Sequence, residues 1–367
     1  MRILQINSAK NFGGGERHLV DLIRGLTGRG HEVFLAVRPG SPIPEKLPGF
    51  PPENILEVPI KNALDLFAVR RLIKFIRARE IEIVHAHTGK DYLPASLAVR
   101  AARDVRLVIT RHVLFPLKKA QKITLKNVSR AIAVSSGVEA NLRKTFPPER
   151  IVVVPNGIDA EKRAGVDRET LRSEFRFENN IPFDAPVLGT VGELKHLKGQ
   201  QDFILAAQEV AKRHAEARFI IVGKDNSYGG SFRRELKRLV KVFDLEERFI
   251  WFDWIEDTRP LLSALDLFVS PSHSESFGLA ILEAMASGCA VVSTETEGAK
   301  GLIENGKSGL LTPIKEPIRL ANVICEILED KEKLKNMGGN ARTRARENFG
   351  LERMVEETEK VYRNIER

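Results

Sequence analysis

Two carboxylates eight positions apart are the first feature of this sequence that could do chemistry. Glu275 follows the apolar run at 267–270, and Glu283 lies five positions beyond Gly278. The N–H groups of a helix that begins at Gly278 can bind phosphate oxygens, because they lack helical partners and lie at the positive end of the helix dipole. Carboxylates accept hydrogen bonds from hydroxyl groups. The segment could therefore hold a ligand that carries two sugars and phosphates.

Three other groups are of suitable chemical type. The glycines at 13–15 lie between an apolar run and a helical pattern, where exposed backbone N–H groups can approach phosphate or a polar sugar. Their spacing is not G-x-G-x-x-G, so they do not predict a dinucleotide site, and a turn that needs positive φ is the alternative interpretation. Lys198 could neutralise phosphate charge, and otherwise it is a solvated surface cation. His85, His87 and His112 follow or end apolar runs and are candidates by type.

The sequence predicts no metal site. It contains no Asp-x-Asp pair, and its histidines and cysteines do not have the spacing of metal ligands. Its two cysteines, Cys289 and Cys325, are too few for a disulfide framework and are expected to be reduced and structural.

The elements that must position these residues alternate between strand and helix. We expect helices at 19–26 and 67–79 in the first half, separated by short apolar runs, and further helical patterns in the second half. Such alternation predicts parallel sheets covered on both faces. The expected strands are at 3–6, 33–37, 81–85, 105–110, 131–134, 151–154, 187–191, 219–222, 249–252, 267–270 and 290–293.

The 367 residues exceed one ordinary core, so we expect two doubly wound α/β domains that face a cleft. The first covers residues 1–175 and the second residues 184–350, with a linker near 165–185. A charged amphipathic helix at 351–367 is expected to pack back onto the first domain.

The basic charge lies in one half of the chain. The net charge is +9, yet residues 1–163 contain 28 Lys and Arg against 15 Asp and Glu. This asymmetry favours an anionic partner such as a membrane surface, and solubility alone is the alternative. The stretch 116–126, with four lysines among apolar residues, could rest on an anionic membrane if it is helical. The first half lacks interleaved aromatic residues, which argues against nucleic acid.

Neither a signal peptide nor a membrane-spanning run is evident, so we expect a cytoplasmic protein, in possible peripheral contact with the inner face of the membrane.

The whole pattern resembles the group 1 glycosyltransferases, the retaining GT-B family 4. The segment Glu275–Glu283 resembles the Glu-x7-Glu signature of that family. The segment 154–159 (VPNGID) resembles its interdomain turn, 83–87 (IVHAH) resembles its His-x-His strand end, and 283–288 (EAMASG) also matches. The resemblance covers nearly the whole chain, and together these motifs are more specific than any one of them.

The resemblance implies a metal-independent transfer, with retention, of a hexose-type sugar from a nucleotide diphosphate donor linked to UDP or GDP. No cofactor is implied, and the acceptor would be a glycan or a lipid-linked sugar of the cell envelope, such as lipopolysaccharide. Glu275 would hold the sugar, Lys198 the leaving diphosphate, and His112 the donor sugar at the cleft. The nucleotide sugar would be bound by Gly14, Gly15, Ser276, Phe277, Gly278, Leu279 and Glu283.

Two positions depart from the family. Glu193 stands where the family usually has an arginine that contacts the diphosphate. Either Lys198 acts alone, or Lys195, His196 or a first-domain arginine substitutes, or activity is reduced. Gly301 stands where the family often has a glutamate. Because of these departures, a non-catalytic protein that binds nucleotide sugars is an alternative interpretation. An epimerase or hydrolase on the same fold is a second alternative.

Overall fold

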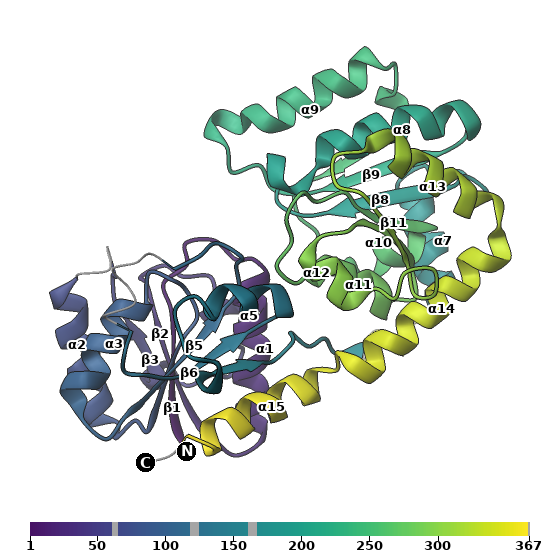
Figure 1. Cartoon of the computed structure of the whole chain (residues 1–367). Helices are drawn as coiled ribbons and strands as arrows, with labels where there is room; N and C mark the ends of the chain where they lie inside the picture. The colour runs from purple at the N-terminus through teal and green to yellow at the C-terminus, as the bar shows by residue number, and fades with distance from the viewer. Residues whose placement is uncertain (61–64, 118–124, 161–166, 366–367) are drawn as a thin grey trace. The chain divides into compact units, whose positions relative to one another are not determined.

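The computed structural model describes residues 1–60, 65–117, 125–160 and 167–365. The chain forms two compact units: Met1–Gly157 with Leu351–Arg367, and Ile158–Gly350. Each unit is a parallel sheet covered by helices (Figure 1). The prediction of two α/β domains with parallel sheets is confirmed.

The first unit contains a seven-stranded sheet in the order β3-β2-β1-β4-β5-β6-β7. The central strands are buried on both faces, which explains their continuous apolar runs: Ile3, Leu4 and Ile6 of β1 have no exposed surface. The strands are β1 (Arg2–Asn7), β2 (Glu32–Val37), β3 (Ile55–Glu57), β4 (Ile83–Ala86), β5 (Arg106–Arg111), β6 (Val128–Ala133) and β7 (Ile151–Val153).

The last helix of the chain completes the core of this unit. Met354, Val355 and Tyr362 of α15 are buried in the same apolar cluster as the inner face of α1. The two helices approach closely at Gly25, where a Cβ atom would lie 2.3 Å from a methyl group of Val355. The helices of this unit are α1 (Gly14–Gly28), α2 (Leu66–Ala78), α3 (Tyr92–Ala102), α5 (Ser136–Leu142) and α15 (Leu351–Arg363).

The second unit contains a six-stranded sheet in the order β10-β9-β8-β11-β12-β13. Its strands are β8 (Val187–Val191), β9 (Arg218–Val222), β10 (Phe249–Phe252), β11 (Leu267–Ser270), β12 (Ala290–Thr294) and β13 (Leu310–Thr312). Its helices are α7 (Arg168–Glu178), α8 (Gln200–Arg213), α9 (Ser231–Val242), α10 (Thr258–Ala264), α11 (Leu279–Ala286), α12 (Glu297–Leu302), α13 (Pro317–Glu329) and α14 (Lys331–Asn348).

The expected linker at 165–185 and the expected domain boundary at 175–184 are wrong. The boundary falls between Gly157 and Ile158, and α7 belongs to the second unit. Arg176 of α7 is 1% exposed, and its guanidinium donates to Asp266 Oδ2 (2.9 Å) and to the carbonyl oxygen of Ala264 (2.9 Å). The helix therefore docks largely through arginine rather than through an apolar stripe, so its sequence reads as a polar linker.

Candidate functional site

The second unit has a natural ligand site where β8 and β11 lie side by side. From β8 the chain runs outward to β9 and β10, and it then crosses to β11 on the other side of β8. Loops that leave the carboxyl ends of two such strands diverge and open a crevice between them. The loop after β8 contains Lys198, and the loop after β11 contains Glu275.

Lys198 and Glu275 meet at this point. The Lys198 ammonium donates to Glu275 Oε2, and the two side chains are 25% and 16% exposed. The geometry depends on Gly199, which has φ +67° and lies so close to the end of β11 that a Cβ atom would be 1.9 Å from the Pro271 carbonyl oxygen. A cation and a carboxylate predicted from separate motifs are thus brought together.

The N-terminus of α11 lies beside this pair. Gly278 caps the helix with φ +99°, a conformation that favours glycine. The preceding loop is held in place, because Gly298 N donates to the Glu275 carbonyl oxygen (2.9 Å) and a Cβ atom on Gly298 would lie 2.6 Å from the Phe277 carbonyl oxygen. Ser276 lies in this loop, and Leu279 is the first residue of the helix. The first N–H groups of a helix have no acceptor within it, so they can bind an anion.

Glu283 lies farther along α11. Its Oε2 atom accepts a hydrogen bond of 3.1 Å from Thr258 Oγ1 at the start of α10. The two glutamates therefore occupy different settings, one in the loop next to a cation and the other on the helix next to a hydroxyl group.

Lys195 and His196, the basic neighbours of Glu193, each contact another side chain of the second unit. The Lys195 ammonium donates to Glu193, and Asn226 Nδ2 donates to Glu193 Oε1 (3.0 Å). Burial raises the pKa of Glu193, but these hydrogen bonds outweigh it and lower the pKa overall. The ring of His196 packs against Phe232 at 4.5 Å. Lys195 is therefore engaged by the residue that it would have to replace.

Gly301 has open space where a side chain would project, with no atom within 4 Å of a Cβ position. The surrounding structure therefore leaves room for a larger side chain, such as that of glutamate, at this position.

The first unit repeats the same arrangement at β1 and β4, where its chain reverses direction across the sheet. Gly14 and Gly15 begin α1 directly after β1, and Gly13 caps it with φ −150°. The interpretation of these glycines as a positive-φ turn is therefore wrong. Glu16 closes the loop by accepting from Gly13 N (3.0 Å) and Asn7 Nδ2 (3.1 Å).

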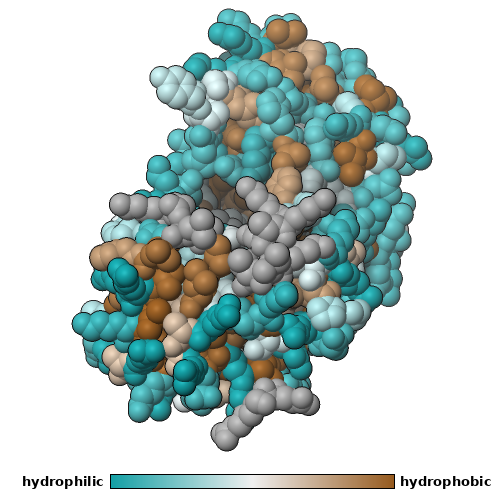
Figure 2. Space-filling view, turned by 60° about the vertical axis from the view of Figure 1, so that its left-hand side comes forward, coloured by the Kyte–Doolittle hydropathy of each residue, from teal (hydrophilic) through white to brown (hydrophobic). Residues whose placement is uncertain are grey.

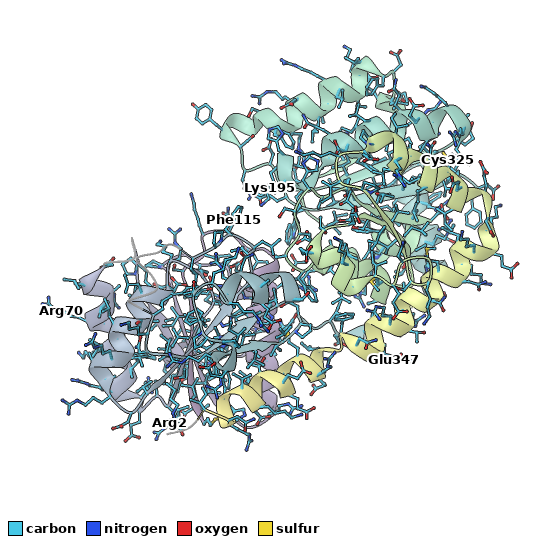
Figure 3. All side chains as sticks on the ribbon, viewed as in Figure 1. Arg2, Arg70, Phe115, Lys195, Cys325 and Glu347 are labelled. Atoms are coloured by element: carbon cyan, nitrogen blue, oxygen red, sulfur yellow. The ribbon has the colours of Figure 1, made fainter. Side chains whose placement is uncertain are left out.

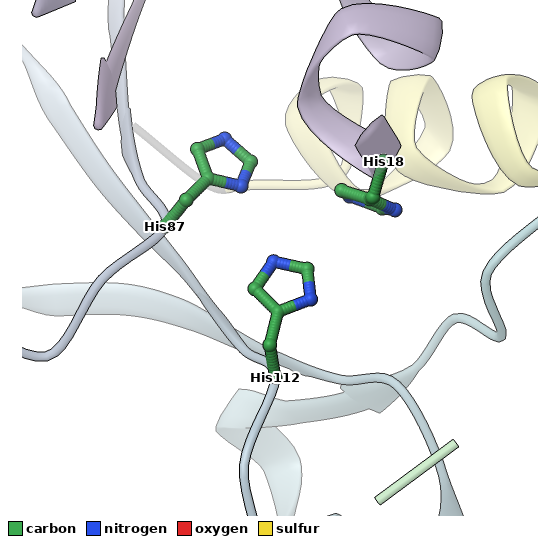
Figure 4. A group of neighbouring side chains, drawn as sticks. All are labelled: His18, His87 and His112. Carbon is green, nitrogen blue, oxygen red and sulfur yellow. The ribbon is translucent and has the colours of Figure 1, made fainter. Parts of the chain in front are cut away.

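Three histidines gather next to this loop (Figure 4). His112 follows β5, and its ring lies 3.7 Å from where a Cβ atom on Gly15 would be. His87 follows β4, and His18 projects from α1; the ring centroids of His18 and His112 are 4.8 Å apart. Burial lowers the pKa of His18 to about 4, although the neighbouring Asn156 side chain opposes the shift. Burial and the neighbouring imidazoles also lower the pKa of His87 and of His112 well below 6.5. All three rings are therefore neutral at pH 7.

A chain of hydrogen bonds between buried side chains orients one ring of this cluster. His87 Nε2 lies 2.7 Å from Gln5 Oε1, and Gln5 Nε2 donates to the Tyr362 hydroxyl (3.3 Å). The same hydroxyl lies 2.6 Å from His85 Nδ1. Tyr362 belongs to α15, so the last helix of the chain takes part in positioning the histidines.

The sequence did not single out His18, Gln5 or Tyr362. A signal for two of them was present: Gln5 is the polar residue within the apolar run of β1, and His18 begins the apolar stripe of α1. Nothing in the sequence indicated that Tyr362, more than 350 positions from Gln5, lies beside it.

Of the four lysines in the stretch 116–126, Lys126 lies within the described residues and the other three lie outside them.

The surface of the first unit carries exposed apolar and basic side chains together. Leu66 and Phe67 of α2 are 64% and 62% exposed, and Phe115 is 66% exposed. Apolar residues lie among hydrophilic ones in the space-filling view (Figure 2), and Arg70 and Phe115 are labelled in Figure 3. Within the described parts of the chain, no helix is long and apolar enough to cross a membrane.

Comparison with known proteins follows the division into two units. Residues 172–344 match the family model described as "Glycosyl transferases group 1", and residues 12–162 match the model "Glycosyltransferase Family 4". The D-inositol 3-phosphate glycosyltransferase of Corynebacterium efficiens is 30% identical over 320 residues, which cover 81% of this chain and 74% of that protein.

Two further relatives differ in how much of their length is matched. The enzyme of the same name from Corynebacterium jeikeium is 34% identical over 59% of this chain, and the match spans about half (52%) of that relative. The UDP-Gal:alpha-D-GlcNAc-diphosphoundecaprenol alpha-1,3-galactosyltransferase of Escherichia coli is 26% identical, over 81% of this chain and 79% of that protein.

Solved structures share the fold. A glycosyltransferase from Rickettsia africae has a TM-score of 0.88 at 23% identity, covering 99% of this chain and 98% of that one. Anabaena Alr3699/HepE, solved in complex with UDP and glucose, has a TM-score of 0.85 at 23% identity, covering 98% of each chain.

Proposed function

Because this chain belongs to the group 1 glycosyltransferases, we propose that it transfers a hexose from a nucleotide diphosphate sugar with retention of configuration and without a metal ion. The observation that carries this proposal is the contact between Lys198 and Glu275 beside the N-terminus of α11. A cation, a helix N-terminus and a carboxylate at one crevice match the three parts of a sugar diphosphate: two anionic phosphates and a hydroxylated ring.

The donor would be divided among these groups by charge. The backbone N–H groups of Phe277, Gly278 and Leu279 would bind the diphosphate, and Lys198 would neutralise the charge that develops on it as the bond to the sugar breaks. Glu275 would accept hydrogen bonds from sugar hydroxyls, and Glu283 from the ribose. In the absence of ligand Lys198 and Glu275 neutralise each other, so both are already in place before the donor arrives.

His112 would contact the donor sugar as a neutral imidazole, since burial lowers its pKa. An uncharged ring can accept a hydrogen bond from a hydroxyl group at one nitrogen and donate from the other. Retention is an expectation from the family: the acceptor would attack on the face from which the diphosphate leaves. UDP is the first nucleotide to test, because HepE was solved with UDP and glucose.

The acceptor is proposed to be a lipid-linked or polysaccharide precursor of the cell envelope. The name of the Escherichia coli relative specifies a diphosphoundecaprenol acceptor. The helix α2 presents Leu66 and Phe67 next to the exposed basic residues Arg70 and Arg71. Apolar side chains that insert among lipids and cations that meet anionic head groups are the two parts of an interfacial helix. We therefore propose peripheral contact with an anionic membrane through this unit.

The test of the donor site compares Glu275→Gln with the exposed control Glu247→Gln. Wild-type protein is first heated with a panel of UDP, GDP and ADP sugars, since a ligand at about 100 times its Kd adds about 2.7 kcal/mol of stability. With the donor so identified, Glu275→Gln should lose nearly all transfer while its circular dichroism stays unchanged, and Glu247→Gln should keep full activity. Normal transfer by the folded Glu275 variant would refute the role of this carboxylate.

The pairing of Glu193 with Lys195 favours one second candidate, a non-catalytic protein that binds nucleotide sugars. Such a protein would be stabilised by the donor yet release no nucleotide with any acceptor. An epimerase or hydrolase would instead isomerise the donor or release free sugar without an acceptor.

A further inference from the structure

The histidine cluster of the first unit has the composition of a metal site. His18, His87 and His112 each offer a ring nitrogen, and these three atoms lie within 4.8 Å of one another. The rings come from three different segments and are turned toward a shared space (Figure 4). His18 and His87 are 4% and 3% exposed. This site could not be predicted from the sequence, because the three residues are 69 and 25 positions apart.

The hydrogen bonds of His87 determine which of its nitrogens is available. Its Nε2 atom lies 2.7 Å from Gln5 Oε1, an oxygen that can only accept, so Nε2 carries the proton. The Nδ1 atom of the neutral ring then has a lone pair, and it is buried with no hydrogen-bond partner among the described residues. A histidine whose second nitrogen donates to a carbonyl-type oxygen is the usual supporting arrangement of a metal ligand.

The position of Gln5 is itself held. Its amide donates to the Tyr362 hydroxyl at 3.3 Å, and that hydroxyl lies 2.6 Å from His85 Nδ1. His85 Nε2 in turn lies 2.7 Å from Thr110 Oγ1. The orientation of His87 is therefore maintained by a buried chain of four further side chains, rather than by packing alone.

We propose that His18, His87 and His112 bind a transition-metal cation of the Zn²⁺ class, with a fourth position left for water. Three imidazoles favour Zn²⁺, Co²⁺, Ni²⁺ or Cu²⁺ over Mg²⁺ and Ca²⁺, which prefer oxygen ligands. Tetrahedral coordination at about 2.0–2.1 Å places ligand nitrogens about 3.3 Å apart, so the rings need to move by about 1.5 Å or less.

Metal binding at this site inhibits transfer, and this part of the inference rests on the proposed function. A nitrogen of His112 that is bound to metal is no longer available to the sugar. The nearby charge of Arg111, which contributes to the lowered pKa of His112, opposes a cation here. The site therefore releases its metal more readily than one backed by a carboxylate.

The test is a titration of chelator-treated protein with Co²⁺, followed by visible absorption. Wild-type protein should bind one equivalent with the intense bands of tetrahedral Co²⁺, and Zn²⁺ but not Mg²⁺ should displace it. His18→Gln and His87→Gln should each weaken binding at least about tenfold. The control His214→Gln, in the second unit, removes one imidazole and should change nothing. No stoichiometric binding by wild-type protein, or equal binding by all three variants, overturns the site.

Two further measurements keep the result interpretable. Thermal melting establishes that each variant is folded, and Gln5→Leu, which leaves all three ligands in place, should also weaken Co²⁺ binding by about 10–100-fold if the hydrogen bond to His87 positions the ring. With transfer as the readout, Zn²⁺ should inhibit wild-type protein at the concentrations that displace Co²⁺, and His18→Gln should need at least about ten times more. Because the titration uses no nucleotide sugar, a failure of the proposed function leaves the test of the metal site intact.

Discussion

Replacing Lys198 by methionine should reduce turnover by a factor of about 10²–10³ and leave the fold unchanged. At about 4 Å and an effective dielectric constant of about 20, one unit charge interacts with another by about 4 kcal/mol. At about 1.4 kcal/mol per factor of ten, this corresponds to almost three orders of magnitude in rate. The full value is not reached, because the side chain is 25% exposed and water replaces part of the lost charge.

The effect should fall on kcat more than on KM. Negative charge on the diphosphate grows as the sugar leaves, so the ammonium stabilises the transition state more than the bound donor. The stability of the protein should change by no more than about 1 kcal/mol, because Lys198 and Glu275 are both partly exposed.

The assay is release of nucleoside diphosphate from the donor identified by thermal stabilisation, with Lys195→Met as the matched control. Lys195 is another lysine of the same loop, it is 47% exposed, and it pairs with Glu193. A loss in Lys195→Met as large as that in Lys198→Met, or a Lys198 variant that raises KM at constant kcat, would refute the assignment of Lys198 to the leaving group.

Three other predictions concern the same loop and the C-terminal helix. Glu193→Arg should raise turnover about tenfold by placing a second cation near the diphosphate; unchanged turnover in a folded variant would mean that this position does not face the donor. Gly199→Ala should destabilise the protein by at least about 2 kcal/mol and reduce transfer, since φ is +67° and the new Cβ atom meets the Pro271 carbonyl oxygen. In the control Gly339→Ala the new Cβ atom meets no atom within 4 Å, so thermal melting should show this variant to be as stable as wild type or more stable. Glu359→Gln should lower the free energy of unfolding at pH 7 by about 1–2 kcal/mol, because hydrogen bonds from Arg363, and also from His31 and Arg29, lower the pKa of Glu359 from 4.5 to about 2. This stabilisation is complete above pH 4.5 and is lost as the pH falls toward 2, so urea denaturation should show the difference between wild type and variant shrinking over that interval.

The strands of both sheets could be predicted because burial on both faces demands continuous apolar runs. Val187–Val191 and Leu267–Ser270 coincide with expected strands for this reason. Two of the three-residue strands, β3 (Ile55–Glu57) and β13 (Leu310–Thr312), were not predicted, whereas β7 (Ile151–Val153) was, because it lies in the continuous apolar run 151–154. The helix α7 was missed because it buries few apolar side chains. It buries Phe175 together with Arg176, whose charge is satisfied by Asp266 and by backbone carbonyl oxygens.

Part of the candidate site could likewise be predicted from the sequence, and part of it could not. Lys198 and Glu275 could be named from the sequence, and their placement together follows from the rule that ligands bind where strand order reverses. Their direct contact could not be predicted, because it depends on how closely Gly199 approaches Pro271. Tyr362 could not be named, because a tyrosine on the apolar stripe of a helix is indistinguishable in the sequence from an ordinary core residue.

The two places where strand order reverses differ in charge: an ion pair lies at β8 and β11, and neutral imidazoles lie at β1 and β4. This difference suits the two places to different ligands. At β8 and β11 an ammonium and a carboxylate remain partly exposed, so each can exchange its partner for a phosphate or a hydroxyl group at little cost in desolvation. At β1 and β4 the groups are imidazoles whose pKa is lowered by burial, and the neighbouring cation, Arg111, is buried and donates to the Phe115 carbonyl oxygen. We therefore propose that phosphate binds in the second unit and that the first unit is suited to ligands that recognise neutral nitrogen, namely sugar hydroxyls and transition-metal cations. Competition between these two ligands for His112 is the consequence that the Zn²⁺ inhibition experiment measures.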